Sequence, residues 1–396
     1  MKRSSEGSFL LSGVVLISTA EFALKSQPVR RQLIRLLKRH VRFNLKRAGL
    51  ETCEIRLAGG FLVVGNFDNA ESVANGLARI FGVAHADACE RAASSLDEIV
   101  ECATRLAEEK LKPGETFAVR ARNYEPSRLK SKEIEVRAGA EILSRLPSGV
   151  RVNLSNPDHT LRVFFGANDA FVSAMRFDGP GGLPVGSQGK LLGLATDPVH
   201  SPLSFYLLMK RGAMVSPVIP NIPSLLGETQ VDVILEGLRT LKSFVPRKGL
   251  LARIIELDDD ASKVLDEVDR RLQRVFSVRL TLRAIAHLVQ SHGALGLVTG
   301  DRFGRDGLET LKDLRIVDHV SKFPIYRPLL TMDEVAVNRE LGALGLQQLV
   351  TKEVARQVSQ VVFSDASIAN LKEVEEHVQA ERLAQRIATN STRILI

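Results

Sequence analysis

Residues 196–201, Thr-Asp-Pro-Val-His-Ser, lie between the apolar run KLLGLA and the helix-like run SPLSFYLLMK, which is the layout of a nucleotide-binding strand, loop and helix. Phosphate-binding loops use glycine because it reaches positive φ and lets a phosphate approach the backbone amides. Here Pro198 has no amide hydrogen, and Asp197 adds a carboxylate where a polyanion would bind. We expect only weak anion binding at this loop, through the free amides and dipole of a helix that begins near residue 202.

Two further side chains in this loop carry chemistry. His200 would partly offset the negative charge if it were protonated, but we expect a capping or surface residue, because that is the commoner role of a single histidine at a helix start. Ser201 supplies a hydroxyl next to the helix start. The catalytic residues stay unassigned.

The three cysteines, Cys53, Cys89 and Cys102, lie far apart without a CxxC pair, and none follows residue 102. This spacing predicts neither a disulfide framework nor a metal site, and a reducing, cytoplasmic compartment is the expectation. We expect Cys53 and Cys89 to be buried in strands or helices.

Basic residues exceed acidic ones by 54 to 46, for a net charge of +8 and a pI near 9.5, which favours a polyanionic partner. They concentrate in two places. The run at residues 30–47 places one helical stripe of cations beside an apolar stripe, and a second group lies on a strand and the connection that follows it. The alternative for both is ordinary solvated charge. The candidate RNA-binding residues are Arg31, Arg35, Lys38, Arg120, Arg122, Arg128, Lys130 and Lys132; Arg42 and Lys46 continue the first stripe.

The order of elements predicts two or three domains in the 396 residues. Residues 9–85 show strand, helix, strand, helix, with Asn69 placed to cap the last helix. The N-terminal apolar run also resembles a signal peptide, but its length and β-branched residues favour a buried strand. No run approaches the length of a membrane helix. After the Gly- and Pro-rich stretch near residue 180, apolar strands alternate with helices, which predicts a parallel sheet covered on both faces.

Several of these segments together resemble the tRNA 4-thiouridine synthetases, or tRNA sulfurtransferases. The resemblance rests on TFAVRARNYEPSRLKSKEIEVRAGAEIL, RVNLSNPDHTLRVFF, FDGPGGLPVGSQGKLLGL, EFALKSQPVRRQL and LVTGDRFGRDGLETL. It implies an α+β ferredoxin-like N-terminal domain at 1–85 and an RNA-binding THUMP domain at 86–178. It also implies an α/β doubly wound parallel-sheet domain of the PP-loop type at 179–396. The EFALKSQPVRRQL match favours a first strand over a signal peptide.

The same resemblance implies tRNA as partner, ATP as cofactor, and a homodimer. The residues that it places near the nucleotide are Leu194, Ala195, Ser201, Arg279, Thr299, Gly300 and Glu309. The chain departs from the family pattern at the loop Ser-Gly-Gly-Ile-Asp-Ser, of which only the final serine, Ser201, remains. It has Ile219-Pro220 in place of a His-Phe pair, and Glu309 in place of a glutamine.

Family members carry sulfur on cysteine thiols or hold an iron–sulfur cluster in the C-terminal domain, where this chain has no cysteine. Residues 349–371, where paired cysteines would be expected, supply serines. We therefore expect a tRNA-binding member of the family that has lost or altered ATP-dependent thiolation. The alternative is an active sulfurtransferase that adenylates a tRNA uridine and takes sulfur from an external donor protein or from sulfide.

Overall fold

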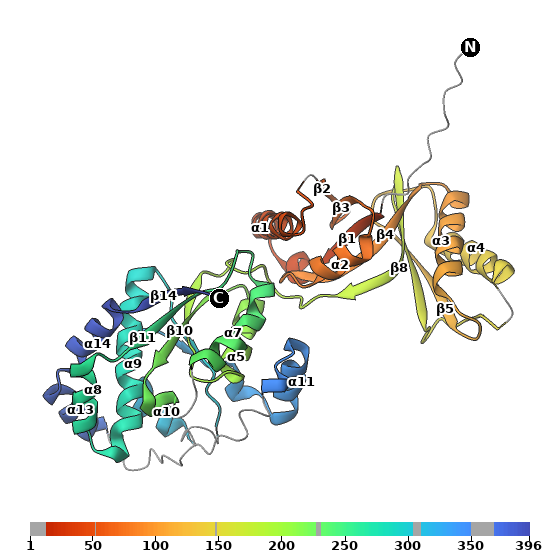
Figure 1. Cartoon of the computed structure of the whole chain (residues 1–396). Helices are drawn as coiled ribbons and strands as arrows, with labels where there is room; N and C mark the ends of the chain where they lie inside the picture. Colours follow the sequence, from red (N-terminus) through yellow and green to blue (C-terminus); the bar gives the residue numbers. More distant parts are fainter. Residues whose placement is uncertain (1–12, 52, 147–148, 227–230, 304–309, 350–367) are drawn as a thin grey trace. The chain divides into compact units, whose positions relative to one another are not determined.

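The computed structural model describes residues 13–51, 53–146, 149–226, 231–303, 310–349 and 368–396 (Figure 1). The chain divides into two compact units, Met1–Gly182 and Leu183–Ile396.

The N-terminal unit is built on one eight-stranded sheet of order β2-β3-β1-β4-β8-β7-β5-β6. Its first half follows the β-α-β-β-α-β order of a ferredoxin-like domain, and the long strands β4 and β8 pair antiparallel to join that half to the rest of the sheet. The elements are β1 (Gly13–Thr19), α1 (Gln27–Arg47), β2 (Ile55–Ala58), β3 (Phe61–Phe67), α2 (Ala70–Ala78), β4 (Val83–Ala93), α3 (Leu96–Lys110), β5 (Thr116–Asn123), α4 (Ser131–Arg145), β6 (Arg151–Val152), β7 (His159–Phe165) and β8 (Asp169–Asp178).

Among the residues that the structure describes, the α-helices of this unit cover one face of the sheet. Helices α2 and α3 pack on β4 and β8, α4 packs on α3 and β5, and α1 packs beside α2. Alternate strand residues such as Phe117, Val119 and Leu161 form a core with α3 and α4. The residues between them point to the opposite face, which we call the helix-free face. The buried cluster on that face contains strand and turn residues only, among them Leu16, Phe61, Phe164 and Phe171.

The sheet curls over one end of its helix-free face. The rings of Phe61 on β3 and Phe164 on β7 lie 5.2 Å apart between centroids, although β1, β4 and β8 stand between their strands. The turn between β2 and β3 reaches the end of β5, where a Cβ on Gly59 would lie 2.1 Å from the Tyr124 carbonyl oxygen. Since Gly59 also has a φ of +52°, only glycine fits this closure.

A bulge changes the alternation of side chains along β8. The pairing with β4 shifts between Ala88 and Glu90, where β8 has one residue more than its partner. Beyond the bulge, Met175 points to the helical side, and Arg176 lies opposite Asp87 on the helix-free face.

The C-terminal unit contains a six-stranded sheet of order β13-β12-β9-β10-β11-β14; β10, β11 and β14 are labelled in Figure 1. Its β9, β10, β11 and β12 are parallel, as predicted. Two strands were not predicted: β13 joins β12 parallel, and the C-terminal strand β14 joins β11 antiparallel. The strands are β9 (Lys190–Leu194), β10 (Met214–Asn221), β11 (Leu251–Glu256), β12 (Leu297–Thr299), β13 (Ile325–Tyr326) and β14 (Thr392–Leu395). The helices are α5 (His200–Lys210), α6 (Pro223–Leu226), α7 (Val231–Arg239), α8 (Asp259–Glu267), α9 (Arg270–His292), α10 (Leu311–Asp318), α11 (Glu334–Leu344), α13 (Ile368–His377) and α14 (Ala380–Thr389).

Two groups of helices pack on this sheet. Helices α5 and α7 pack against each other and on β10, while α9 packs with α14, α13 and α8. The chain passes from β9 to β10 and β11 in one direction, and then crosses back beyond β9 to β12. The strand order therefore reverses between β9 and β12, and in open α/β sheets ligands bind at such a point, outside the carboxyl ends of the strands. The loop at 196–200 begins at this position.

Candidate nucleotide loop and nucleic-acid interface

Two side-chain oxygens bind the backbone amides of the loop between β9 and α5. The Oδ1 atom of Asp197 accepts hydrogen bonds from Val199 N at 2.7 Å and His200 N at 2.5 Å. The Oγ atom of Ser201 accepts from Thr196 N at 3.2 Å and from the Asp197 N at 3.3 Å. Pro198 has no amide hydrogen. Every amide hydrogen from 196 to 200 therefore binds an oxygen of the protein itself.

The tautomer of His200 follows from its neighbours. Arg302 lies with Nη1 3.3 Å from His200 Nε2, and since arginine is only a donor, Nε2 must be the acceptor. The proton of the neutral imidazole is then on Nδ1, which lies 3.3 Å from both Asp197 oxygens. His200 is only 5% exposed, so the surface role expected for it is wrong.

Two glycines bring neighbouring elements into contact with the loop backbone. A Cβ on Gly237 of α7 would lie 1.9 Å from the Pro198 carbonyl oxygen, and a Cβ on Gly300, after β12, would lie 2.8 Å from Ser201 N. The loop residues from Asp197 to His200 are all buried. These contacts explain both glycines by packing, without a ligand.

The strand-end turn after β12 is also bound internally. Thr299 Oγ1 donates to Asp301 Oδ2 at 2.7 Å, and Arg327 Nε donates to the same oxygen at 2.7 Å. Ser204 on α5 donates to the Thr299 carbonyl at 2.5 Å, which ties the helix to the end of β12.

The helix-free face of the N-terminal unit concentrates arginines, which are Arg56, Arg91, Arg120, Arg122, Arg162 and Arg176. Asp169 Oδ2 accepts from Arg56 at 2.7 Å and from Arg91 at 2.5 Å. The Arg122 guanidinium lies 5.4 Å from the Phe61 ring centroid, a cation–π distance. These three arginines rim the curled end of the sheet.

Three other arginines, Arg120, Arg162 and Arg176, lie on adjacent strands toward the open end of this face, and we call them the open-face cluster. Arg176 forms a bidentate pair with the fully buried Asp87, at 2.8 and 3.0 Å. In the parallel pair of β5 and β7, Arg120 lies directly beside Arg162. Burial, together with the Arg176 charge, lowers the pKa of the Arg162 guanidinium.

Family comparisons agree with this architecture. The sequence matches a family described as Thiamine biosynthesis protein (ThiI) over residues 186–383, half of the chain. The chain belongs to the ThiI family. Residues 93–174 match the THUMP domain and residues 14–86 match the ThiI ferredoxin-like domain. The expected fold, with ferredoxin-like and THUMP domains followed by an α/β PP-loop domain, is thereby confirmed.

Relatives of the chain are named as tRNA sulfurtransferases. A probable tRNA sulfurtransferase of Methanosarcina mazei is 26% identical over 349 residues, which cover 87% of this chain and 86% of that protein. The tRNA sulfurtransferase of Thermoplasma volcanium is 29% identical over 333 residues, covering 83% of this chain and 67% of that protein.

Two crystal structures share the fold. A 4-thiouridine synthetase–RNA complex with bound ATP superposes with a TM-score of 0.81 at 22% identity, covering 97% of this chain and 100% of that one. PH1313 from Pyrococcus horikoshii OT3 has a TM-score of 0.66 at 24% identity, covering 84% of this chain and 99% of that one.

Most of the residues predicted near the nucleotide lie together in this ThiI member. Leu194 pairs with Thr299 across β9 and β12, and Ala195 continues β9 by donating to the Val218 carbonyl at 2.9 Å. Ser201 and Gly300 meet in the contact described above. Glu309 lies outside the described residues.

Arg279 is the exception, because its side chain is fully buried and bound elsewhere. It forms a bidentate pair with Glu375 of α13, at 2.6 and 2.8 Å, and donates to the Ile316 carbonyl. Arg283 adds a third contact to Glu375 at 2.7 Å. Burial opposes ionisation of Glu375, but the hydrogen bonds and charges of the two arginines outweigh it and lower its pKa.

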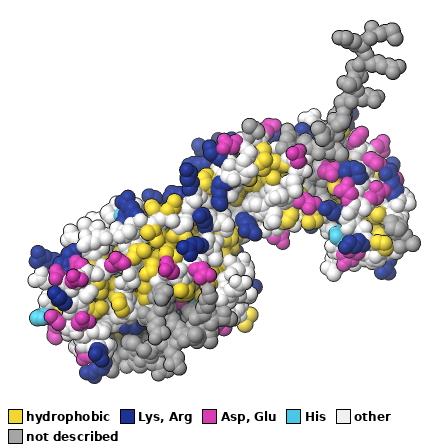
Figure 2. Space-filling view, in the orientation of Figure 1, with side chains coloured by type: hydrophobic (Ala, Val, Ile, Leu, Met, Phe, Trp, Pro, Cys, Tyr) yellow, Lys and Arg dark blue, Asp and Glu magenta, His cyan; other side chains and the backbone are white. Residues whose placement is uncertain are grey.

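The predicted RNA-binding side chains are mostly exposed, and they lie in two places. Figure 2 shows Lys and Arg gathered over α1, where Arg31 and Arg35 are exposed and Lys38 is half-buried. Arg120 and Arg122 belong to the helix-free face, whereas Arg128 and Lys130 lie between β5 and α4, and Lys132 lies at the start of α4.

Sequence reasoning missed Arg56, Arg91, Arg162 and Arg176. Each is a single basic residue in its own strand, so no local run of charge marks it. Only the sheet order and the bulge in β8 bring them to one face.

The cysteines differ in part from expectation. Cys89 is buried in β4, as predicted, and Cys102 is buried in α3. Cys53 is partly exposed and belongs to no helix or strand, so that part of the prediction is wrong. Of residues 349–371, those at 350–367 lie outside the described residues.

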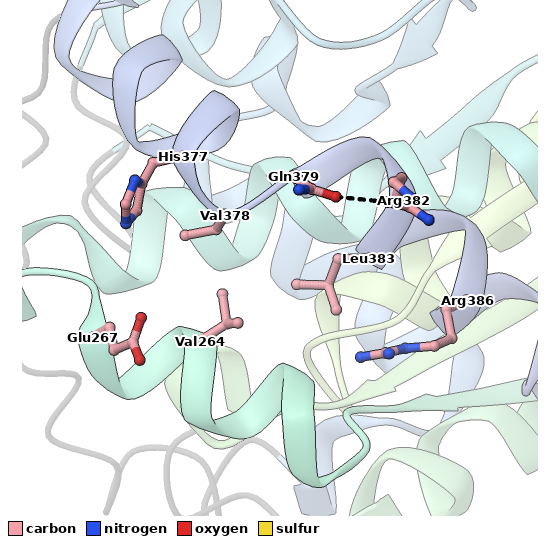
Figure 3. A pocket seen from close by; sticks show the side chains of 8 residues that line it. All are labelled: Val264, Glu267, His377, Val378, Gln379, Arg382, Leu383 and Arg386. Carbon is pink, nitrogen blue, oxygen red and sulfur yellow. Dashed lines mark hydrogen bonds between the residues drawn. The ribbon is translucent and has the colours of Figure 1, made fainter.

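A cavity of about 570 Å³ lies between α8 and the turn from α13 to α14 (Figure 3). It is lined in part by His377, Gln379, Arg382 and Arg386, none of them a predicted site residue. Arg386 pairs with Asp258 at 2.8 Å, and Arg382 donates to Gln379 Oε1 at 2.9 Å. Its two arginines therefore already have partners.

Within the described ranges, no helix is long and apolar enough to cross a membrane. The same residues contain no group of three or more His, Cys, Asp or Glu side chains placed to hold a metal ion.

Proposed function

We propose that this chain is a tRNA-binding member of the ThiI family in which ATP-dependent thiolation is lost. The observation that carries this proposal is the Asp197 carboxylate, which takes the amides that a pyrophosphate would need. A phosphate entering the loop would have to displace an anion that is covalently attached and buried. It would also meet the backbone contacts of Gly237 and Gly300.

The thiols support the same proposal. A thiolate, and not a thiol, is the sulfur nucleophile. Burial raises the pKa of Cys89 well above its usual value, and raises that of Cys102 to about 12, with Glu90 adding to the rise. Burial also raises the pKa of Cys53. All three thiols are thus held in the form that carries sulfur poorly.

RNA binding by the N-terminal unit completes the proposal. Relatives that span most of this chain are tRNA sulfurtransferases, and one structure of the same fold is an RNA complex. We assign phosphate contacts to the exposed stripe of α1 and to the basic residues on and after β5, since guanidinium and ammonium groups bind RNA through its backbone. Those residues are Arg31, Arg35, Lys38, Arg120, Arg122, Arg128, Lys130 and Lys132.

One observation favours the alternative, an active sulfurtransferase with an external sulfur donor. Leu194, Thr299, Gly300 and Ser201 lie together at the switch point of the sheet, where ligands bind in open α/β folds. A homodimer, a cytoplasmic location and domain boundaries at 85/86 and 178/179 also belong to the proposal. The first of these boundaries falls inside β4.

Titration calorimetry with ATP and magnesium tests the loss of nucleotide binding. We expect no saturable heat, whereas a micromolar dissociation constant would contradict the closed loop. The activity itself is tested by deleting the gene and measuring 4-thiouridine in bulk tRNA. The level of this nucleoside should not change on deletion; its disappearance would establish the alternative.

A further inference from the structure

The open-face cluster holds more positive charge than its neighbours neutralise. Asp87 binds Arg176 through two hydrogen bonds, and the charges of Asp87 and Asp178 only partly offset the effects of burial and of Arg176 on Arg162, whose pKa stays lowered. In the described part of the chain, Arg120 binds the carbonyl oxygen of Leu154, and Arg162 binds that of Thr160 at 3.2 Å. Neither of these two guanidiniums contacts a carboxylate among the described residues, although their residues are direct neighbours in the sheet.

Such an arrangement opposes folding unless an anion joins it. Like charges directly opposite each other in a sheet are destabilising. Arg162 is half-buried, so water screens it less than it screens a surface arginine. The bulge in β8 adds to the imbalance, because it turns Arg176 onto this face instead of the thioether of Met175.

The hydrogen bonds also fix the guanidiniums in place. Arg120, Arg162 and Arg176 each have a partner within the sheet, and they project from the adjacent strands β5, β7 and β8. Less side-chain entropy is lost when an already ordered guanidinium binds. Planar donors on neighbouring strands suit an oxyanion with several acceptor oxygens.

We propose that the open-face cluster is a phosphate-binding site, and that its occupant is the backbone of RNA. This inference rests on the proposed tRNA-binding function and extends it to Arg162 and Arg176. The guanidiniums supply the donors that RNA phosphate oxygens accept, and such contacts position the RNA without carrying sequence information.

The test compares matched double substitutions in the full-length chain. Arg120→Gln with Arg162→Gln removes two cations from the cluster and leaves the Asp87–Arg176 pair intact. Arg137→Gln with Arg145→Gln, on α4 of the helical side, removes the same charge elsewhere in the unit. Binding of unfractionated tRNA is measured by fluorescence anisotropy at several salt concentrations.

For the cluster variant we expect affinity to fall, and the slope of log K against log salt to become shallower by about 0.9 per lost contact. The α4 variant should change the slope by less than half as much. Equal slopes in both variants would overturn the inference while leaving the proposed function standing. Wild-type protein that fails to bind tRNA would refute the proposed function, and this inference with it.

Two further measurements keep the result clear. Thermal unfolding identifies a variant that has lost its fold, in which case Arg162→Gln alone, with half the expected change, decides the question. Competition by inorganic phosphate separates the two sources of the anion. If phosphate binding depends on Arg162 but tRNA binding does not, the site takes a free anion and the inference is wrong.

Discussion

In the N-terminal sheet, Arg120 and Arg162 lie side by side, and the hydrogen bonds described for them go to carbonyl oxygens only. In the C-terminal unit, by contrast, Arg279 forms a bidentate pair with the Glu375 carboxylate. The backbone of the C-terminal unit is neutralised in the same way, since side-chain oxygens of Asp197 and Ser201 bind the amides of the loop at 196–200. The N-terminal unit therefore carries arginine charge that an outside partner can neutralise. In the C-terminal unit, the donors are bound by side chains of the protein itself, including those in the loop at the switch point of the sheet, where a ligand would bind.

The largest expected effect comes from breaking the internal pair. Arg279→Met leaves the carboxylate of Glu375, which is 5% exposed, with Arg283 alone. Removing one partner of a buried ion pair costs about 3–5 kcal/mol, and we expect a loss of that size in urea unfolding. Arg283→Met is the control, because it leaves the bidentate pair in place and should cost less than half as much. A loss below about 1 kcal/mol for Arg279→Met would show that the pair contributes little.

A second test lowers the pH, because protonation of His40 adds positive charge to the N-terminal unit, which already has more basic than acidic residues. His40 on α1 is buried, and burial, with the Arg39 charge, lowers its pKa from 6.5 to about 4. The unfolded chain therefore takes up this proton first as the pH falls, so stability declines below about pH 6.5 and the loss is complete below about pH 4. The full effect is about 3 kcal/mol.

This acid sensitivity is measured by urea unfolding between pH 7 and pH 4, for wild type and His40→Leu. The substitution should remove most of the decline in that interval. Parallel curves for the two proteins would place the acid-sensitive group elsewhere.

Opening the loop should have a smaller effect on stability and a distinct effect on binding. Asp197→Ala removes the acceptor of the Val199 and His200 amides, at about 1–2 kcal/mol, the range for loss of a capping side chain. Because those amides then lack a partner, we expect calorimetry to detect pyrophosphate binding that wild type does not show. Asp258→Ala, which removes the cap of α8, is the matched control and should gain no such binding.

The smallest expected effect on stability belongs to the surface of α1. Arg35 is exposed and bonds only to the Arg31 carbonyl, at 3.4 Å, among the described contacts, so Arg35→Gln should change stability by less than about 0.5 kcal/mol. Its slope of log K against log salt for tRNA should become shallower by about 0.9 if it contacts a phosphate. An unchanged slope would remove Arg35 from the assigned phosphate contacts.

Features encoded over short distances could be predicted from the sequence. The strand, turn and helix around residue 197, the cap at Asn69 and the amphipathic helix α1 each depend on neighbouring residues, and the structure contains them. The internal role of Asp197 could not be predicted, because it depends on how the turn folds back on its own amides.

Contacts between distant residues could not be predicted either. Arg279 and Glu375 are 96 residues apart, and Asp87 and Arg176 are 89 apart. Strands β4 and β8 carry mixed polar and apolar residues, so their hydrophobic pattern does not mark them, and their partners lie far along the chain. The position of Arg279 was predicted from a resemblance, and only the tertiary contacts show its buried partner.

The extra residue in β8 changes the side of the sheet that every later residue of the strand faces. Side chains alternate with a period of two, so deleting one residue at the bulge would exchange Met175 and Arg176 between the two sides of the sheet. The guanidinium would then enter the groove between α2 and α3, and Asp87 would lose its partner. In a family alignment, the charge of this surface would therefore follow insertions and deletions in one strand more closely than it follows substitutions.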